Sequence, residues 1–323
     1  MQTAPEPTQA PRTPAPVWRG RARALATLAL LLALGWLGRR HAGDLDRLAA
    51  AKLGPVFWMA VSVVLARWIF SDIARHTLAT LGHPIARFEV FALTVLSAVP
   101  NLLVPRTGFG ALGVALRARH GVPLAVSGSL LLPLSVLDLV VVAAAGLIVQ
   151  ATLIGFTPPH SGAIAATFAG VFAVACAALF PPVRVPFAPT PLREFLARLG
   201  DAWAHLRGSR GFALRSLALL FAITALQALR LGLAFEALGA TPHFAGLVLA
   251  SLVGDLMFVL ALTPGALGLR EAAIVYCADL AGVTPAASLA AAVLDRIVMT
   301  VVLLALAQLA AWRLFGSGRD RRP

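Results

Sequence analysis

Long apolar runs separated by short polar or basic stretches dominate the chain. They cover residues 24–38, 53–70, 88–104, 122–152, 161–180, 212–239, 244–263 and 284–312. The runs after the first are near or above the roughly 17–25 residues that a helix needs to cross a bilayer. They do not alternate apolar and polar residues, which excludes a transmembrane barrel, and in lipid this leaves helices. The pattern predicts an all-α, polytopic membrane helix bundle of about eight segments.

The remaining polar stretches define the expected domain organisation. Residues 1–18 are rich in Pro and Thr and predict a disordered cytoplasmic tail. A single transmembrane domain follows over 19–315, and 316–323 form a basic cytoplasmic tail. The insert 181–211 carries apolar residues at helical spacing, which fits an amphipathic helix in the interface or a plain cytosolic connector. The first apolar run has no cleavage site after it, so we expect a retained span.

The distribution of arginine predicts the orientation. Segments 153–160 and 240–243 contain no Lys or Arg, whereas 181–211 and both tails are rich in Arg. Because positive loops stay inside, both termini are expected in the cytoplasm of a cell (inner) membrane. The charged stretch 39–52 would then be external, which departs from the rule.

Two regions of the chain resemble each other. "VPRTGFGALGVALRARHGV" begins at Val104 and "TPGALGLREAAIVYCADLAGV" begins at Thr263, and the long apolar run after each contains "VLD". Proline and glycine interrupt both regions, which predicts two broken or re-entrant helices, near 105–120 and 264–282, in an inverted repeat. The alternative is that these residues only kink a spanning helix.

Composition supports the membrane class. Hydrophobic residues make up 59% of the 323 residues, and the mean hydropathy of +0.85 exceeds what a soluble core can bury. The net charge of +13 comes from arginines that lie mostly between apolar runs and at the termini, without interleaved aromatic residues. We therefore expect contact with anionic lipid and no nucleic acid.

Ionisable side chains inside the predicted spans are costly, so each is a candidate functional residue. Together with the residues of the two breaks, they give the following candidates for substrate binding: Arg67, Arg106, Gly108, Arg230, Pro264, Gly265, Gly268, Arg270, Glu271, Asp295 and Arg296. These charged residues have two possible roles. They form buried structural ion pairs, or the arginines bind a phosphate while the carboxylates hold the arginines in place or carry protons. Guanidinium forks match phosphate, which favours an anionic lipid head group.

Adjacency limits how these charges pair. Arg270 and Glu271 are neighbours and point about 100° apart on a helix, so their partners must come from other segments. The pairs left open are Arg270 with Asp295 or Asp255, and Glu271 with Arg296 or Arg230.

Motifs for catalysis are absent from the sequence. There is no HExxH, no GxSxG and no Walker A loop, and the histidines are scattered. We therefore expect no catalytic residue, no metal and no cofactor, and a transporter is favoured over an enzyme.

The motifs "LARW", "NLLVPRTGFGALGVALRARHGV", "TPGALGLREAAIV" and "VLDRIV" are similar to those of the lysylphosphatidylglycerol synthase transmembrane region family, also called flippase-like domain proteins. The resemblance covers about residues 20–313. It implies a membrane bundle that, in bifunctional members, moves aminoacylated phosphatidylglycerol between leaflets; other members are tied to glycan-carrier or hopanoid lipid metabolism.

The family core Pro-Gly-x-x-Gly-x-Arg-Glu-Ala matches this chain from Pro264 to Ala272, with Ala266 in place of a common glycine. Leu134 and Ser135 stand where many members have a Glu-Arg pair, so an ion pair there is lost or moved. The aminoacyltransferase domain of the bifunctional members is missing from the sequence, so we expect no lipid synthesis by it.

The sequence thus predicts a membrane lipid translocator for an anionic phospholipid or a phosphate-bearing lipid carrier. The alternative is a membrane enzyme or accessory subunit in glycolipid or polyprenyl-phosphate lipid metabolism. Membrane lipids with anionic head groups are the expected partners, and a homo-oligomer or a lipid-synthesis partner is left open.

Overall fold

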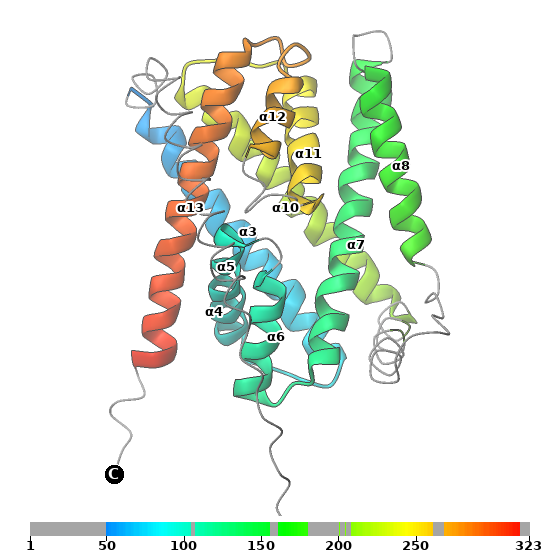
Figure 1. Cartoon of the computed structure of the whole chain (residues 1–323), viewed down its shortest axis with the longest axis vertical. Coiled ribbons are helices and arrows are strands. Elements are labelled where there is room, and N and C mark those ends of the chain that lie inside the picture. The colour runs from blue at the N-terminus through cyan, green and yellow to red at the C-terminus, as the bar shows by residue number, and fades with distance from the viewer. Residues whose placement is uncertain are drawn as a thin grey trace, which may run out of the picture. The chain divides into compact units, whose positions relative to one another are not determined.

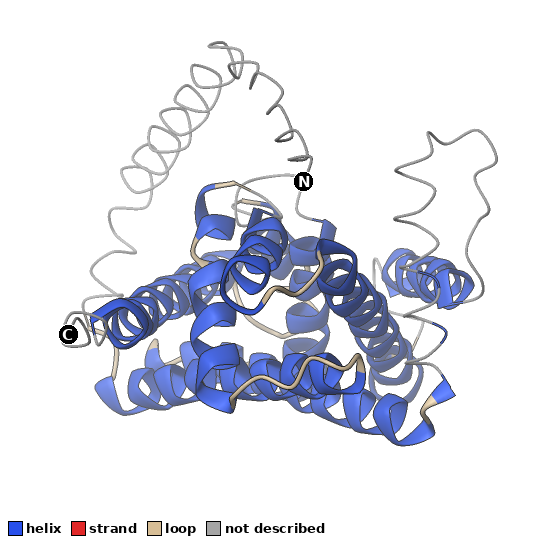
Figure 2. Ribbon diagram, turned by 90° about the horizontal axis from the view of Figure 1, so that it is seen from below, coloured by secondary structure: helices blue, strands red, loops and turns tan. Residues whose placement is uncertain are grey.

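The computed structural model describes residues 50–104, 107–155, 161–179, 208–260 and 268–316, with the single residues 200 and 204. This part of the chain is helical and contains no strand (Figure 2). The first apolar run, the insert 181–199 and both tails lie outside the described residues.

Five helices in the described part are long and apolar enough to cross a membrane, by length and composition. They are α3 (Leu53–Thr80), α7 (Leu124–Val149) with the π-helical turn η1 (Gln150–Ile154), α8 (Ser161–Leu179), α10 (Arg210–Ala237) and α13 (Pro285–Gly316). The all-α, multi-pass membrane class is therefore confirmed.

Shorter helices lie between these spans. The first group is α4 (Arg87–Ala98), α5 (Pro100–Leu103) and α6 (Thr107–His120), and the second is α11 (Phe244–Leu260) and α12 (Leu269–Tyr276). Each group falls in one of the two regions that resemble each other in sequence. The chain positions between α5 and α6 and between α11 and α12 include Pro105 and Pro264, which lie outside the described residues.

Helices α3 and α10 run antiparallel and have the most extensive contact in the bundle. At one end the Lys52 amide donates to the carbonyl of Ala237 at 3.0 Å. At the other end Arg215 donates to Asp72 at 2.6 Å. Helix α3 extends past the predicted end of its apolar run at residue 70, because Ile73, Ala74 and Leu78 are buried in the bundle.

Helices α4 and α6 form an antiparallel pair. The Gly108 amide, at the start of α6, donates to Asn101 Oδ1 at 2.6 Å. Arg119, at the end of α6, lies 3.2 Å from Glu89 at the start of α4. The chain thus turns back beside itself within these two short helices.

Helices α11 and α12 form a second antiparallel pair. The His243 amide, just before α11, donates to the Ala281 carbonyl, just after α12, at 2.8 Å. In the middle of α11, Gly254 faces Ile274 of α12. A Cβ on Gly254 would lie 3.2 Å from Ile274 Cγ1, so glycine permits the close approach of the two helices.

The two short pairs begin at opposite ends of the bundle. The α4–α6 pair follows the C-terminal end of α3, and the α11–α12 pair follows the C-terminal end of α10. Since α3 and α10 are antiparallel, these starting points lie at opposite ends, as Figure 1 shows with α4 and α6 low and α11 and α12 high in the view.

Candidate functional site

A buried cluster of ion pairs joins three helices. The side chain of Asp295, on α13, is only 1% exposed. Both of its carboxylate oxygens accept hydrogen bonds from Arg230 of α10. The second of these bonds, from Nη2 to Oδ2, measures 3.3 Å. Arg270 Nη1 of α12 lies 2.8 Å from the same Oδ2. One carboxylate therefore holds two buried guanidiniums.

Glu271 makes a second connection between α12 and α13. Arg296 Nε donates to Glu271 Oε1 at 2.5 Å, and the Gly268 amide donates to Oε2 at 2.8 Å. Gly268 has a φ of +80°, a left-handed conformation that glycine adopts without the steric cost of a Cβ. Glu271 thus closes the first turn of α12 and ties it to α13, which is a positioning role.

The structure confirms the expected contacts of Arg270 with Asp295 and of Glu271 with Arg296. Arg230 was expected as an alternative partner of Glu271, but it pairs with Asp295. Neighbouring residues on α12 and on α13 therefore pair in two separate contacts, as their directions around a helix require.

Asp255 of α11 lies beside this cluster. Its side chain is buried, and its charge is close enough to interact with Arg230 and Arg270. The Gln227 amide, in the orientation that satisfies both groups, donates to Asp255 Oδ1 at 2.8 Å. Asp255 is therefore held by a neutral partner rather than by a direct ion pair.

The other charged candidates differ in how they are placed. Arg67 on α3 is close enough to Arg230 for their charges to interact, yet it forms no ion pair within the described residues. Asp138 on α7, which matches Asp295 in the repeated "VLD", also has no ion pair there. Arg106, Pro264 and Gly265 lie outside the described residues.

Backbone amides at both breaks are already bonded within the protein. At the α6 start, a Cβ on Gly108 would collide with the Ser97 carbonyl and with Asn101, so only glycine fits there. Its amide donates to Asn101, just as that of Gly268 donates to Glu271. These two amides are therefore occupied and not available to an anion.

Arg270 has a hydrogen-bond donor that is not occupied in this way. Its Nη1 is bonded to Asp295, but its Nη2 is buried and has no hydrogen-bond partner in the described part of the chain. A buried guanidinium N–H without a partner is costly. This nitrogen can donate a hydrogen bond to an anion.

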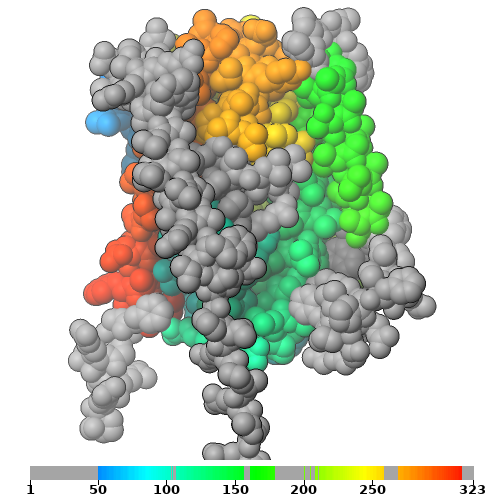
Figure 3. Space-filling view, in the orientation of Figure 1, coloured from blue at the N-terminus to red at the C-terminus, as the bar shows by residue number. Residues whose placement is uncertain are grey.

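An apolar cavity of about 240 Å³ lies on the side of α12 that carries Ala273 and Tyr276. It is lined by α8, α11 and α12, including Phe168, Met257, Ala273 and Tyr276. Ala273 comes one helical turn after Arg270, so α12 links the cavity to the ion pairs. Figure 3 shows the green α7–α8 pair lying beside the yellow and orange α11–α12 pair on this face.

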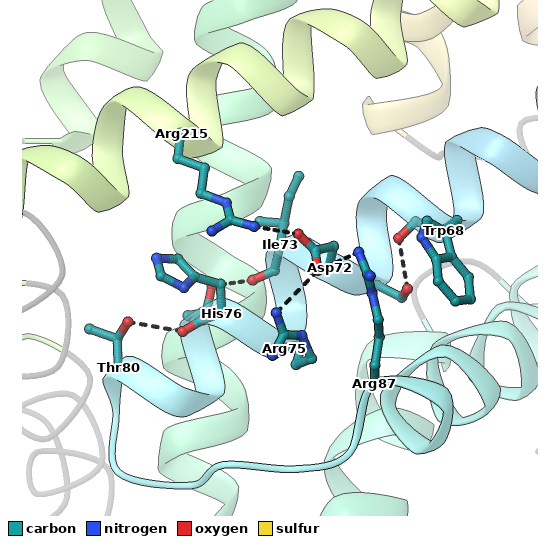
Figure 4. A network of polar contacts seen from close by, with 10 residues as sticks. Trp68, Asp72, Ile73, Arg75, His76, Thr80, Arg87 and Arg215 are labelled. Carbon is teal, nitrogen blue, oxygen red and sulfur yellow. Dashed lines mark hydrogen bonds and ion pairs between the residues drawn. The ribbon is translucent and has the colours of Figure 1, made fainter.

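A second charged network, not anticipated from the sequence, surrounds Asp72 near the end of α3 (Figure 4). Three arginines contact its carboxylate: Arg75 at 3.4 Å, Arg87 at 3.1 Å and Arg215 at 2.6 Å. The sequence signal was the helical spacing of Asp72 and Arg75, which the expected end of the helix at residue 70 concealed.

In the part of the chain that the structure describes, no group of three or more His, Cys, Asp or Glu side chains could hold a metal ion. Both cysteines are free, Cys277 being buried and Cys176 half-buried.

Comparison with known proteins identifies a family. The profile of the family described as lysylphosphatidylglycerol synthase TM region matches residues 21–307. No curated protein and no solved structure matches the chain.

Proposed function

Because this chain belongs to the lysylphosphatidylglycerol synthase transmembrane region family, we propose that it moves a phosphate-bearing membrane lipid between leaflets. The lipid is an anionic phospholipid or a phosphate-bearing lipid carrier. The observation that carries the proposal is the sharing of Asp295 by Arg230 and Arg270 inside a bundle of membrane helices.

The charges of this contact favour an anion. Two guanidiniums on one carboxylate leave a local formal charge of +1, and Arg270 keeps an unpartnered Nη2. Asp255 offsets this charge from a greater distance, but its hydrogen bond goes to Gln227. A phosphate oxygen would give the guanidinium the charge-assisted hydrogen bond that it lacks.

The apolar cavity supplies the second requirement for a lipid. A phospholipid needs hydrocarbon surface within a few ångströms of its head-group partners, and the cavity wall at Ala273 lies on the same short helix as Arg270. We assign the cavity to part of an acyl chain of a lipid, and the phosphate of that lipid contacts Arg270.

The short lengths of α4, α6 and α12 support two re-entrant pairs, whereas α11, with 17 residues, is at the lower limit for a span. Helix α4 has 12 residues and α6 has 14, which correspond to about 18 and 21 Å at 1.5 Å per residue, whereas the hydrocarbon core is roughly 30 Å thick. Helix α12, with 8 residues, is shorter still. We propose that the α4–α6 and α11–α12 pairs enter from opposite membrane faces, as in the inverted repeats of secondary transporters.

Charge at the two ends of the bundle supports an orientation. The end where α3 and α6 finish and α10 begins carries Arg75, Arg117, Arg119 and Arg215. The C-terminus of α13 lies at the same end, because Leu314 packs against the cluster that contains Leu78. Following the positive-inside rule, we place this end and both termini in the cytoplasm of the cell (inner) membrane.

Lipid analysis tests translocation against enzymatic chemistry. Total lipids extracted from cells with and without the protein should contain the same covalent species, while the share of an anionic lipid in the outer leaflet changes. Disappearance of a lipid species without the protein, at unchanged leaflet distribution, would contradict the proposal and favour a role in lipid synthesis.

A further inference from the structure

The three arginines around Asp72 come from three different helices. Arg75 lies on α3, Arg87 is the first residue of α4, and Arg215 lies in the second turn of α10. Each points at one carboxylate whose side chain is only 9% exposed, as Figure 4 shows. Arg75, Arg87 and Arg215 are called the arginine cluster below.

The arginine cluster carries more charge than its carboxylate can balance. Three guanidiniums and one carboxylate leave a formal charge of +2. The nearby Glu89 does not reduce it, because it lies 3.2 Å from Arg119 and 3.1 Å from His120 Nε2. His76, one residue after Arg75, stacks on Phe212 at 5.9 Å between ring centroids and adds no negative charge.

Within the described residues, many of the N–H donors of the arginine cluster are unused, and the three side chains are partly exposed. Each guanidinium has five N–H donors, but each gives only one nitrogen to Asp72. The Nε of Arg75 is buried without a hydrogen-bond partner within the described residues. The side chains are 35% exposed for Arg75, 52% for Arg87 and 47% for Arg215, so a ligand can reach them.

Neighbouring groups hold the cluster in place. The Arg87 guanidinium lies 4.8 Å from the centre of the Trp68 ring, a cation–π contact that fixes its plane. Trp68 is itself packed against Phe91, with ring centroids 5.3 Å apart. Arginines held in advance by an aromatic ring and a carboxylate lose less entropy when they bind an anion.

We propose that the arginine cluster binds a phosphate group, supplied by an anionic lipid head group or by free phosphate. Its place at the ends of membrane-spanning helices is the depth at which lipid phosphates lie, which favours the lipid. This site shares no residue with the Asp295 contacts, and it does not depend on lipid translocation.

Thermal stability of the purified full-length chain in detergent tests the proposal. The probes are dihexanoyl phosphatidylglycerol, dihexanoyl phosphatidylcholine and inorganic phosphate. We expect the anionic lipid to raise the Tm of the wild type, and the double variant Arg87→Gln/Arg215→Gln to need a roughly tenfold higher concentration for the same rise. The control Arg117→Gln, an exposed arginine at the same end of the bundle, should respond as the wild type.

The probes also identify the source of the phosphate. A rise in Tm with inorganic phosphate that disappears in the double variant would assign the site to free phosphate. Equal rises with both lipids, or an unchanged response of the double variant, would overturn the proposal.

Replacement of the carboxylate gives an independent test if the double variant does not fold. Asp72→Asn leaves three arginines without their shared counter-charge and should lower the Tm. Under the proposal, dihexanoyl phosphatidylglycerol restores a larger part of the Tm in Asp72→Asn than it adds to the wild type, because a phosphate replaces the lost carboxylate. If the anionic lipid does not restore the lowered Tm of Asp72→Asn, the arginine cluster has only a structural role.

Discussion

Arg270 Nη1 lies 2.8 Å from Asp295 Oδ2, and this contact connects the short helix α12 to the long helix α13. Arg230 bonds to the same carboxylate from α10. Helix α12 is therefore anchored to α10 and α13 through one buried side chain. A change in the binding partner of Arg270 would therefore act directly on the position of α12.

Asp295→Asn should strongly destabilise the protein. It removes the shared charge and leaves two buried guanidiniums unpaired, and breaking a buried ion pair in this way costs about 3–5 kcal/mol. The measurement is the Tm of the purified protein in detergent.

Asp138→Asn is the matched control for this change. Asp138 occupies the corresponding "VLD" in the first half of the chain but has no ion pair within the described residues. Its replacement should lower the Tm much less. Similar losses for the two variants would contradict the view that Asp295 is the anchor.

Gly108→Ala should weaken the α4–α6 pair. The added Cβ would collide with the Ser97 carbonyl and with Asn101, and overpacking of this kind costs about 1–3 kcal/mol. Gly110→Ala, two residues later in the same helix, meets no atom within 4 Å and should be neutral or stabilising by up to about 1 kcal/mol. Thermal melts should therefore show a lower Tm for Gly108→Ala and an unchanged or higher Tm for Gly110→Ala. Equal changes in Tm would contradict the close contact of Gly108 with Ser97 and Asn101.

Opposite entry of the two helix pairs predicts opposite chemical access. Single cysteines are introduced by Arg117→Cys at the end of α6 and by Asp279→Cys just after α12, both exposed positions, after Cys176 and Cys277 are replaced by alanine. A membrane-impermeant maleimide should label Asp279→Cys in intact cells, and Arg117→Cys only after permeabilisation. Labelling of both positions from the same side would rule out the inverted arrangement.

The sequence predicted the five long helices because their apolar runs are long, whereas the predicted number of about eight segments is not confirmed within the described residues. The run 284–312 corresponds to α13, and 161–180 corresponds to α8. It also limited the ion pairs correctly, because neighbouring residues on a helix cannot share a partner. What it could not provide was the crossing of α10 near α13, and so the pairing of Arg230 with Asp295 was missed.

The network at Asp72 shows a different limit. Hydropathy ends the apolar run at Phe70, whereas the helix continues to Thr80 because one face stays buried. Arg87 and Arg215 are 15 and 143 residues from Asp72 in sequence, so only the packing of α4 and α10 on α3 brings the arginines together. The sequence likewise does not show that the Gly108 and Gly268 amides are bonded to Asn101 and Glu271.

Reconstitution into vesicles tests lipid translocation most directly. Phosphatidylcholine vesicles carry a trace of fluorescent phosphatidylglycerol in both leaflets, and dithionite bleaches only lipid that reaches the outer leaflet. We predict that the wild type makes inner-leaflet lipid accessible and that folded Arg270→Ala slows this roughly tenfold or more, as loss of a charge-assisted bond of about 1.5–3 kcal/mol implies. Arg117→Gln should move lipid as the wild type does. If the wild type moves no anionic lipid, or if folded Arg270→Ala moves it as fast as the wild type, the proposed function is contradicted.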